Sequence, residues 1–485
     1  MNYKLMGKFL SQISALEFLF MIPALIIALS LGESVAVSAF LLTMAIIAAV
    51  TLVLWLPCRK SGSGFGVREG MVCCSAAWVI LAVLGALPFV FSGVLPRFVD
   101  ALFETVSGFT TTGSSVISGI GIETMPRSVL YWRSVTHWVG GMGVLVFLLA
   151  RSPGEGGKGF IMHLLRAESP GPDVGKLVPK MKQTARILYL IYIAMSIINL
   201  IFLLLGGMNA LDAVCTMFGT AGTGGFGIRS DSMASFSPYV QNVTTVFMFL
   251  FGVNFSCYYL ILLGNFKSVF KDDELRFYLL LIFASITLIA LNVRDLYTTW
   301  EETVRHSAFQ VGTIMSTSGF STTDFDIWPA FSKGILMMLM IFGGCAGSTA
   351  GGLKVARAML LLKSLRRNIR QVLNPRKVQV VRVNGKAVDE TVLDNANAYL
   401  AAYFVLLVLS YLLVSLDGHS VETNLSGVLA CLNNVGPGLG KLGPMCDFGH
   451  LSDLSKLTLT ADMLIGRLEI FPILILFSRT TWKRK

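Results

Sequence analysis

The sequence predicts an all-α polytopic membrane protein with two leading helices and then four repeats of helix, half-helix, glycine loop and helix. Three observations predict this class. Of the 485 residues, 54% are hydrophobic and only 14% are charged, whereas soluble domains carry about a quarter charged residues. Several apolar runs are long enough to cross a bilayer. Four shorter apolar segments, each followed by a glycine-containing loop, lie between these runs.

The long runs come first in the chain and then flank every short segment. A helix that crosses the hydrocarbon core needs about 20 apolar residues. The runs that meet this length are 9–31, 36–57, 71–95, 130–150, 184–206, 240–263, 275–292, 334–361, 396–416 and 460–478. The first two have no short segment between them, so we expect them to be a leading pair.

The short segments cover 99–110, 209–220, 302–315 and 422–433. Each is about half the length that a span needs, which is typical of a re-entrant half-helix. Acidic residues near their starts suit the positive end of a helix dipole. Grouping each segment with its flanking runs predicts a leading unit and four repeats, with boundaries at 1–69, 70–155, 156–266, 267–365 and 366–485.

The loops that follow the half-helices carry the chemistry. Aligned on one glycine, they read Thr111-Thr112-Gly113-Ser114, Gly222-Thr223-Gly224-Gly225, Thr317-Ser318-Gly319-Phe320 and Asn434-Val435-Gly436-Pro437. Their side chains are small or neutral, so the ligands they offer are carbonyl oxygens, and a ring of carbonyls replaces the water shell of a cation. Close helix packing explains one such loop equally well. Four at matching positions favour a shared cation path.

Two further features lie at membrane depth. The residues Gly343–Gly352 interrupt the run at 334–361, either as a functional loop beside protein or water or as a packing kink. Arg467 lies in the run at 460–478, and an intramembrane charge indicates a functional residue. An ion pair with Asp462 or Glu469 is the alternative, although neither has the helical spacing for it.

The basic residues predict the orientation. With the amino terminus assigned to the cytosol, 29 of the 39 Lys and Arg residues fall in inner segments and nine in outer segments, as the positive-inside rule requires. Both termini are then cytoplasmic and the four loops open outward. This rule explains the net charge of +11 better than nucleic-acid binding. The basic segment 363–394 follows the same rule, or it binds anionic lipid or a soluble partner.

These features resemble the Trk/Ktr/HKT superfamily of potassium transporters over the whole chain. The two leading helices and the length resemble the bacterial Trk-type membrane subunit. The resemblance implies four tandem M1–pore-helix–M2 repeats around one pore in the bacterial inner membrane. The family's filter glycines fall on Gly113, Gly224, Gly319 and Gly436. Members with Ser at the first position tend toward sodium, so Gly113 favours potassium, although Gly222 and the Asn434-Val435 pair leave strict selectivity open.

The resemblance also divides the candidate residues into a filter and a gate. The filter, whose carbonyls would bind K⁺, comprises Thr111, Thr112, Gly113, Thr223, Gly224, Thr317, Ser318, Gly319, Asn434, Val435 and Gly436. The gate comprises Gly343, Gly344, Ala346, Gly347, Ser348, Thr349, Gly351, Gly352 and Arg467.

The expected function is potassium uptake through one channel-like pore. The resemblance implies a homodimer, regulated by a cytosolic nucleotide-binding ring of RCK type, with no cofactor in this chain. An ion-coupled transporter, moving K⁺ with Na⁺ or H⁺, is the alternative, although repeats that run the same way favour an axial pore. An enzyme is not expected, because the segment around Gly347 lacks the Gly-Lys-Ser/Thr ending of a P-loop and the eight cysteines show no zinc spacing.

Overall fold

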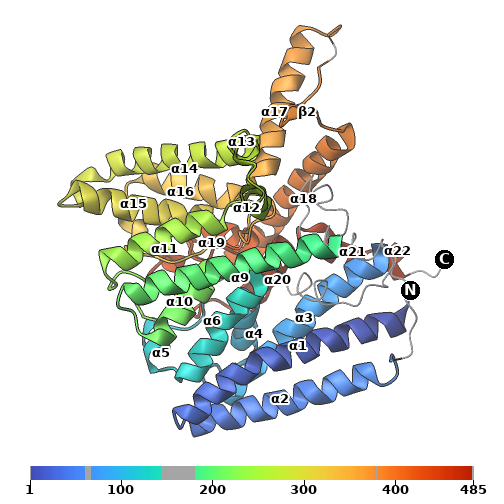
Figure 1. The fold of residues 1–485 in the computed structure, drawn as a ribbon, viewed down its shortest axis with the longest axis vertical. Coiled ribbons are helices and arrows are strands. Elements are labelled where there is room, and N and C mark those ends of the chain that lie inside the picture. The colour runs from blue at the N-terminus through green and yellow to red at the C-terminus, as the bar shows by residue number, and fades with distance from the viewer. Residues whose placement is uncertain (1, 60–66, 142, 144–180, 378, 483–485) are drawn as a thin grey trace.

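The computed structural model describes residues 2–59, 67–141, 143, 181–377 and 379–482. This part of the chain is helical except for loops and one small hairpin, in which β1 (Arg382–Val383) pairs antiparallel with β2 (Lys386–Ala387). Figure 1 shows the helices packed side by side, with α17 leaving the body of the molecule together with the hairpin. The predicted all-α class is confirmed.

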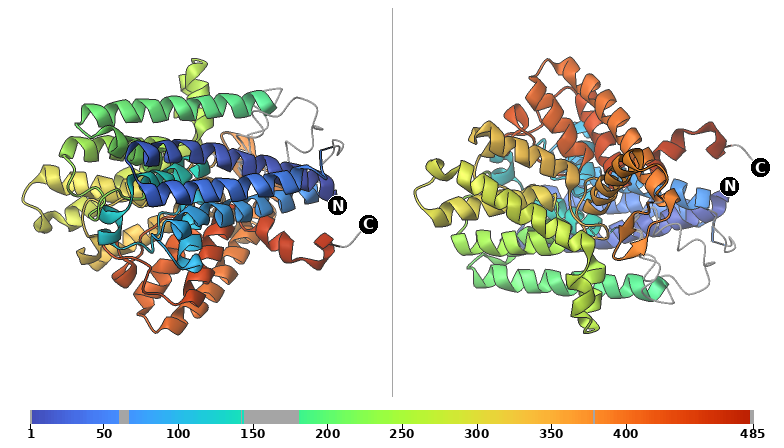
Figure 2. Two further views of the ribbon diagram at one scale, coloured as in Figure 1. Left: turned by 90° about the horizontal axis from the view of Figure 1, so that it is seen from below. Right: turned by 90° about the horizontal axis from the view of Figure 1, so that it is seen from above.

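The leading pair is present. Helices α1 (Tyr3–Ser30) and α2 (Ser34–Trp55) pack against each other, and α1 also packs on α3 (Val67–Phe91) and α6 (Arg127–Gly141). Among the described residues, six helices are long and apolar enough to cross a membrane, or seven if one bent pair counts as a span. Figure 2 shows that α1 begins, and α22 (Arg479–Trp482) lies, at the same end of the bundle.

The predicted half-helices are also present. They are α4 (Phe98–Phe109), α10 (Ala210–Gly222), α15 (Trp300–Met315) and α19 (Val421–Leu432). Their amino termini are fixed by caps in three cases, because the side chains of Asn209, Thr299 and Ser420 accept a hydrogen bond from a backbone N–H two or three residues into the helix, as N-cap residues do.

The remaining elements follow in chain order. They are α5 (Gly119–Thr124), α9 (Met181–Leu205), α11 (Pro238–Phe251), α12 (Phe255–Leu262), α13 (Phe266–Phe270), α14 (Asp273–Asn292), η2 (Arg294–Leu296), η3 (Phe325–Ile327), α16 (Ala330–Phe342), α17 (Val355–Leu373), α18 (Glu390–Val414), η4 (Ser415–Asp417), η5 (Gly440–Leu442), α20 (Asp453–Arg467) and α21 (Phe471–Phe477).

Two of the predicted continuous spans are broken. The run at 240–263 forms α11 and α12, which are bent by 89°. At the bend, the Gly252 carbonyl accepts from the Cys345 N–H, and the Asn254 side chain caps α12. The run at 460–478 breaks after Arg467, where Glu469 and Ile470 have positive φ. The run at 130–150 is helical as far as Gly141; its remainder, and the predicted boundary at 155, lie outside the described residues.

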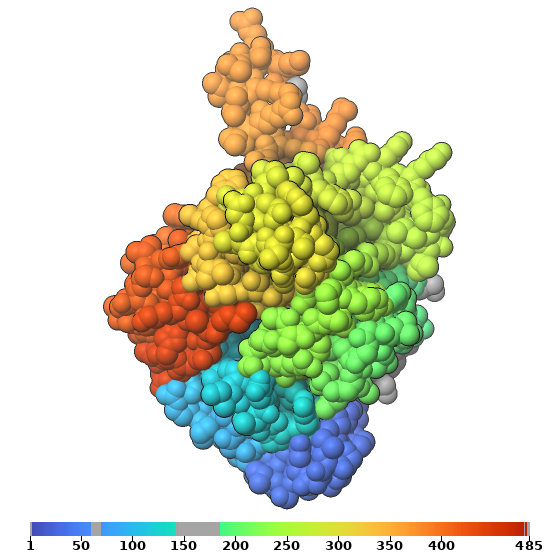
Figure 3. All heavy atoms as spheres, turned by 90° about the vertical axis from the view of Figure 1, so that its left-hand side faces the viewer, coloured from blue at the N-terminus to red at the C-terminus, as the bar shows by residue number. Residues whose placement is uncertain are grey.

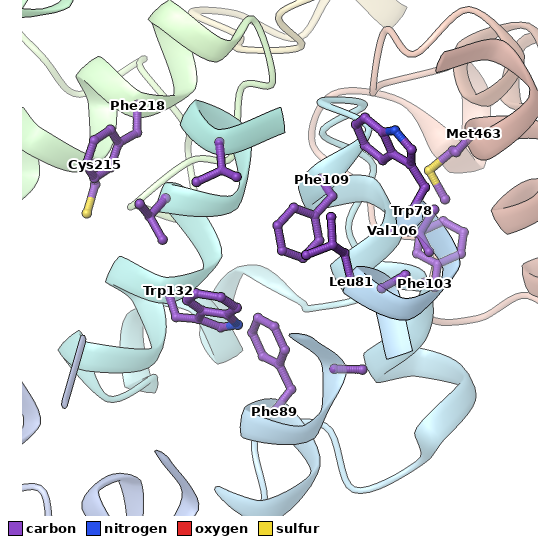
Figure 4. Close-up of a cluster of buried hydrophobic side chains, with 14 of the residues drawn as sticks. Trp78, Leu81, Phe89, Phe103, Val106, Phe109, Trp132, Cys215, Phe218 and Met463 are labelled. Carbon is purple, nitrogen blue, oxygen red and sulfur yellow. The ribbon is translucent and has the colours of Figure 1, made fainter. Parts of the chain in front are cut away.

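Buried aromatic and aliphatic side chains pack against the first half-helix, α4. Phe103, Val106 and Phe109 of α4 are buried, and they face Trp78 and Leu81 of α3 (Figure 4). Trp132 of α6 adds an edge-to-face contact with Phe109, with ring centroids 6.2 Å apart. Such van der Waals packing stabilises helix association in membranes, where the hydrophobic effect gives little. It fixes the loop that follows α4.

The half-helices surround one axis. Figure 3 looks onto the face that carries their preceding and following loops. Segments coloured cyan, green, yellow and orange-red succeed one another around the centre of this face, while the dark-blue leading helices stay at its edge. Four stretches that are about a hundred residues apart in the sequence therefore meet in space.

Candidate functional site

All four half-helices end with the same backbone motif. A residue in the left-handed region follows each helix: Thr111 and Thr223 with φ 56°, Thr317 with φ 57° and Asn434 with φ 54°. Glycine is the usual residue at this position, and a β-branched threonine there is a genuine outlier. Such strain, of order 1–3 kcal/mol per residue, persists only where the surroundings impose it.

Matching hydrogen bonds close each motif. The N–H groups of Thr112, Gly224, Ser318 and Val435 donate to the carbonyl five residues earlier, at 2.7–2.9 Å. The residue before each donates to the carbonyl three residues earlier, at 3.1–3.2 Å. This pair of bonds is the Schellman arrangement. It establishes which residues of the four loops are structurally equivalent.

The equivalence corrects the register of the second loop. Gly113, Gly319 and Gly436 have φ between 85° and 109°, and the second-loop residue with this conformation is Gly225, with φ 70°. Gly224 is instead equivalent to Thr112. Alignment on the first available glycine therefore shifted this loop by one residue and missed Gly225. The shared Thr-x-Gly pattern of Thr111 and Thr317 also reads Thr223-x-Gly225 and indicates the right register.

The four loops touch one another in a closed ring. A Cβ added to Gly113 would lie within 2.8 Å of the Gly224 carbonyl oxygen, and one added to Gly225 would meet the Ser318 oxygen equally closely. In the same way, a Cβ added to Gly319 would meet the Val435 carbonyl oxygen, and one added to Gly436 would meet the Thr112 carbonyl oxygen. Each glycine thus admits the carbonyl of the next loop, and the fourth loop returns to the first.

A pocket of about 120 Å³ lies directly over this ring. Its lining includes the glycine of every loop: Gly113, Gly225, Gly319 and Gly436. Serine hydroxyls, Arg133, Arg229, Cys446 and Asp447 complete its walls. The pocket is lined on its other side by Met445, Cys446 and Phe448, from the segment between η5 and α20.

The second loop is supported differently from the first and third. In the first and third loops a hydroxyl pair braces the turn, Thr110 with Thr112 at 2.7 Å and Ser316 with Ser318 at 2.8 Å. The second loop has glycine at both positions, and the buried His137 ring fills the space. Its Nδ1 is 2.8 Å from the Gly108 carbonyl oxygen, and its Nε2 accepts from the Phe226 N–H. His137 is therefore a packed, hydrogen-bonded histidine.

A buried ion pair joins the first two loops. The Arg133 Nε lies 2.6 Å from Glu104 Oε1, and both side chains are almost fully buried. Glu104 also accepts from the Val116 N–H at 2.9 Å, and Arg133 donates to the Gly227 carbonyl at 3.0 Å. The pair connects α4 and α6 to the backbone on both sides of the ring. The sequence alone did not indicate this ion pair.

The broken run between α16 and α17 reaches the ring from the opposite side. The Gly351 N–H donates to Thr317 Oγ1 at 2.6 Å, and a Cβ on Gly351 would meet the Asn433 carbonyl. The loop also docks in the break between α11 and α12, where the Cys345 N–H donates to the Gly252 carbonyl at 2.9 Å. The interruption is therefore a structured loop and not a packing kink.

Arg467 ties three segments together at this level. Its guanidinium donates to the Thr349 carbonyl at 2.9 Å and to the Gly140 and Gly141 carbonyls at 2.6 and 2.9 Å. The last two are at the carboxyl end of α6, where a positive charge is favourable. Arg467 ends α20 and does not lie within a continuous span.

The structure brings the predicted filter residues together as the ring and its turns, and Gly225 joins them. Of the predicted gate residues, Thr349, Gly351 and Arg467 make the contacts described above. Gly343 packs against Gly351 and Gly352, the Gly344 carbonyl accepts from the Val355 N–H, and Ser348 bonds within the loop. Ala346 and Gly347 bind α14 and α12.

Helices of membrane-spanning length around a closed ring of four loops form the architecture of a membrane transport protein. Residues 36–483 match the model of the TrkH family, described as cation transport protein, so the chain belongs to the TrkH family.

Relatives of known name match over nearly their full length. The Trk system potassium uptake protein TrkH of Escherichia coli K12 is 34% identical over 453 residues, which cover 92% of each chain. The protein of the same name from Halomonas elongata is 32% identical over the full length of both. The crystal structure of the potassium transporter TrkH from Vibrio parahaemolyticus superposes with a TM-score of 0.88 and 30% identity over the full length of both chains.

Proposed function

We propose that the chain takes up potassium ions across the bacterial inner membrane through a single pore whose selectivity filter is the ring of four loops. The observation that carries the proposal is the closed ring in which each glycine meets the next loop's carbonyl. The names of the relatives, which are potassium uptake proteins, support the choice of ion.

In this mechanism an outer K⁺ enters the pocket above the ring and loses water as the loop carbonyls replace it. The carbonyls of Thr112, Gly224, Ser318 and Val435 supply this coordination. The four half-helices direct their negative carboxyl ends at the same place, which favours a cation. Beneath the ring, Thr111 Oγ1 is buried without a hydrogen-bond partner among the described residues and is available to an ion that has passed the filter.

The gate of the proposal is the loop Gly343–Gly352 with Arg467. Two features support it: the bond from Gly351 to Thr317 closes the inner side of the ring, and the Arg467 charge is held by the loop carbonyl of Thr349. Opening would move the loop away from Thr317 and release one anchor of the Arg467 guanidinium, so that a cation no longer meets that charge at close range.

The wider setting follows the same family. We propose a homodimer with both termini in the cytosol, four pore repeats with the boundaries given above, and control by a cytosolic RCK-type nucleotide-binding ring that docks on the basic inner face. Anionic lipid is expected at that face too. K⁺ is the cargo of the pore and not a resident cofactor.

The test is cation flux into liposomes that hold the purified chain, with K⁺, Rb⁺, Na⁺ and Li⁺ compared under an imposed voltage. We expect uptake of K⁺ and Rb⁺ over Na⁺ and Li⁺, and a higher rate with unchanged preference when residues 346–350 are deleted. Equal passage of all four ions would reject the filter. No flux in either protein would reject the pore, and K⁺ uptake that requires a Na⁺ or H⁺ gradient would indicate a symporter.

A further inference from the structure

The amino terminus of α14 carries three consecutive carboxylates, Asp272, Asp273 and Glu274, which contact two different parts of the molecule. Glu274 is 9% exposed, and its Oε1 accepts a hydrogen bond from the Ala346 N–H at 2.5 Å. Ala346 lies in the loop assigned above as the gate. One end of a long helix is thus bound directly to the gate loop by a charge-assisted hydrogen bond.

The two neighbouring carboxylates hold the hairpin that follows α17. Asn384 lies in the turn between β1 and β2. Its Oδ1 accepts a hydrogen bond from the Asp273 N–H at 2.8 Å, and its Nδ2 donates one to Asp272 Oδ2 at 2.8 Å. Its own N–H donates to Asp273 Oδ2 at 3.1 Å. A single asparagine, with φ 50°, therefore bonds reciprocally to the first turn of α14.

Lys363 connects α17 to the same cluster of carboxylates at the start of α14. The Lys363 Nζ donates to Asp273 Oδ2 at 2.7 Å and to the Arg382 carbonyl of β1 at 2.9 Å. Helix α17 is also the direct continuation of the gate loop. The loop is consequently connected to this cluster twice, once through the chain and once through Glu274.

We propose that Asn384 and Lys363, bound to Asp272 and Asp273, form a clasp that holds Glu274 against Ala346 and keeps the gate loop closed. The inference rests on the proposed function, because it assigns control of that same gate. A short helical turn is stiff, so a shift of the Asp272 and Asp273 backbone moves Glu274 with it. In Figure 1 the start of α14 lies where α17 and the hairpin leave the body, which is the surface open to a cytosolic partner.

Overall stability is a poor explanation for this cluster. Asp273 and Lys363 are each about one-third exposed, and ion pairs of that kind contribute little to folding. The bonds instead link residues about 110 positions apart, joining the hairpin turn to the first turn of α14. A partner that binds the hairpin or α17 would pull Asn384 from α14 and so loosen the gate loop.

The experiment measures initial K⁺ flux of the full chain in liposomes for wild type, Glu274→Ala, Asn384→Gly, their double variant and the 346–350 deletion. Glycine suits the positive φ at 384, so Asn384→Gly keeps the turn and removes only the amide. Glu274→Gln keeps a hydrogen-bond acceptor for Ala346. Asp394→Ala removes an exposed carboxylate of α18 as the matched control, and size-exclusion profiles confirm folding of each variant.

We expect Glu274→Ala and Asn384→Gly each to raise the flux roughly tenfold, the shift that loss of one charge-assisted hydrogen bond produces. The K⁺ to Na⁺ preference should stay that of wild type, Glu274→Gln should lie closer to wild type, and Asp394→Ala should equal it. Because both residues act through one device, the double variant should not exceed the larger single effect.

Other results overturn the clasp. If the deletion conducts while Glu274→Ala and Asn384→Gly match wild type, the gate stands and the clasp is wrong. Independent, multiplying effects would separate Asn384 from Glu274 and reject their coupling. If Glu274→Ala does not fold, the surface variant Asn384→Gly decides alone. Absence of flux in the deletion as well rejects the pore itself, and the clasp falls with it.

Discussion

At the residue scale, the ring depends on backbone conformations that side chains oppose. Thr111, Thr223 and Thr317 adopt left-handed φ although glycine would do so at lower cost. Meanwhile the residue two positions on must be glycine, because the next loop's carbonyl occupies the Cβ position. Two of the threonine hydroxyls make contacts that glycine would lose: Thr317 Oγ1 accepts from the Gly351 N–H, and Thr223 Oγ1 donates to the Gly222 carbonyl.

Gly225→Ala tests the corrected register. An alanine at φ 70° is strained by about 1–2 kcal/mol, and its methyl group would displace the Ser318 carbonyl. We expect the ratio of K⁺ to Na⁺ flux to fall about tenfold, since each 1.4 kcal/mol is a factor of ten. Gly334→Ala is the control, because nothing lies within 4 Å of that position. An unchanged flux ratio in Gly225→Ala would place the filter elsewhere.

Arg133→Ala tests the brace between the first two loops. Removing one partner of a buried ion pair leaves an uncompensated charge and costs about 3–5 kcal/mol, so the melting temperature should drop by several degrees. The K⁺ preference should weaken because the Gly227 carbonyl and the Ser115 hydroxyl lose their bonds to the guanidinium. Arg97→Ala is the comparison, because that side chain is 57% exposed beside Asp100 and its loss should cost at most about 1 kcal/mol. Equal melting temperatures for the two variants would contradict the brace.

At the element scale, apolar length and glycine content predicted the half-helices, because a 12- to 16-residue helix followed by a glycine-containing loop is too short to span. The same measure failed at α11 and α12. Their run is long and largely apolar, with Gly252 and Asn254 inside it. The bend at 252–254 arises because the Gly252 carbonyl accepts from the N–H of Cys345, in a loop about 90 residues away. Local composition does not encode such a partner. The register error at Gly225 had a different cause, because alignment on a single glycine ignored the Thr-x-Gly spacing and the backbone conformation that define the equivalence.

The leading helix α1 carries a polar group that its packing does not satisfy. Glu17 is 2% exposed, and neither carboxylate oxygen has a hydrogen-bond partner among the described residues. Because an unpaired buried polar group costs about 1–3 kcal/mol, Glu17→Met should raise the melting temperature by several degrees with K⁺ flux unchanged. An unaltered or lower melting temperature would mean that Glu17 is paired by a lipid or ion.

Glu33→Ala, in the turn between α1 and α2, should change the melting temperature in the opposite direction. Glu33 accepts from the Arg127 and Ser128 N–H groups at 2.6 and 3.1 Å and so caps α6. Loss of a cap costs about 0.5–2 kcal/mol, so this variant should melt lower than wild type. The pair of measurements separates a destabilising carboxylate within α1 from a stabilising one in the turn between α1 and α2.

At the scale of the whole molecule, the cysteines provide a test of orientation without engineering. Seven of the eight are buried, and Cys446 is exposed beside the pocket over the ring. Partial burial and the carboxylates of Asp324 and Asp447 raise the pKa of the Cys446 thiol. Because the thiolate is the reactive form, labelling should be slow at neutral pH and accelerate as the pH rises toward that pKa.

We therefore expect a membrane-impermeant maleimide to label right-side-out vesicles at mildly alkaline pH and to leave inside-out vesicles unlabelled. Because Cys446 lines the pocket with the four ring glycines, labelling should also reduce K⁺ flux, and K⁺ in the pocket should slow the reaction. Cys446→Ser should abolish both the label and the inhibition. Labelling from the inner side alone would invert the topology, and the basic loops would then face outward, against the positive-inside rule. Labelling without loss of flux would leave the topology intact and separate the pocket from the ion path.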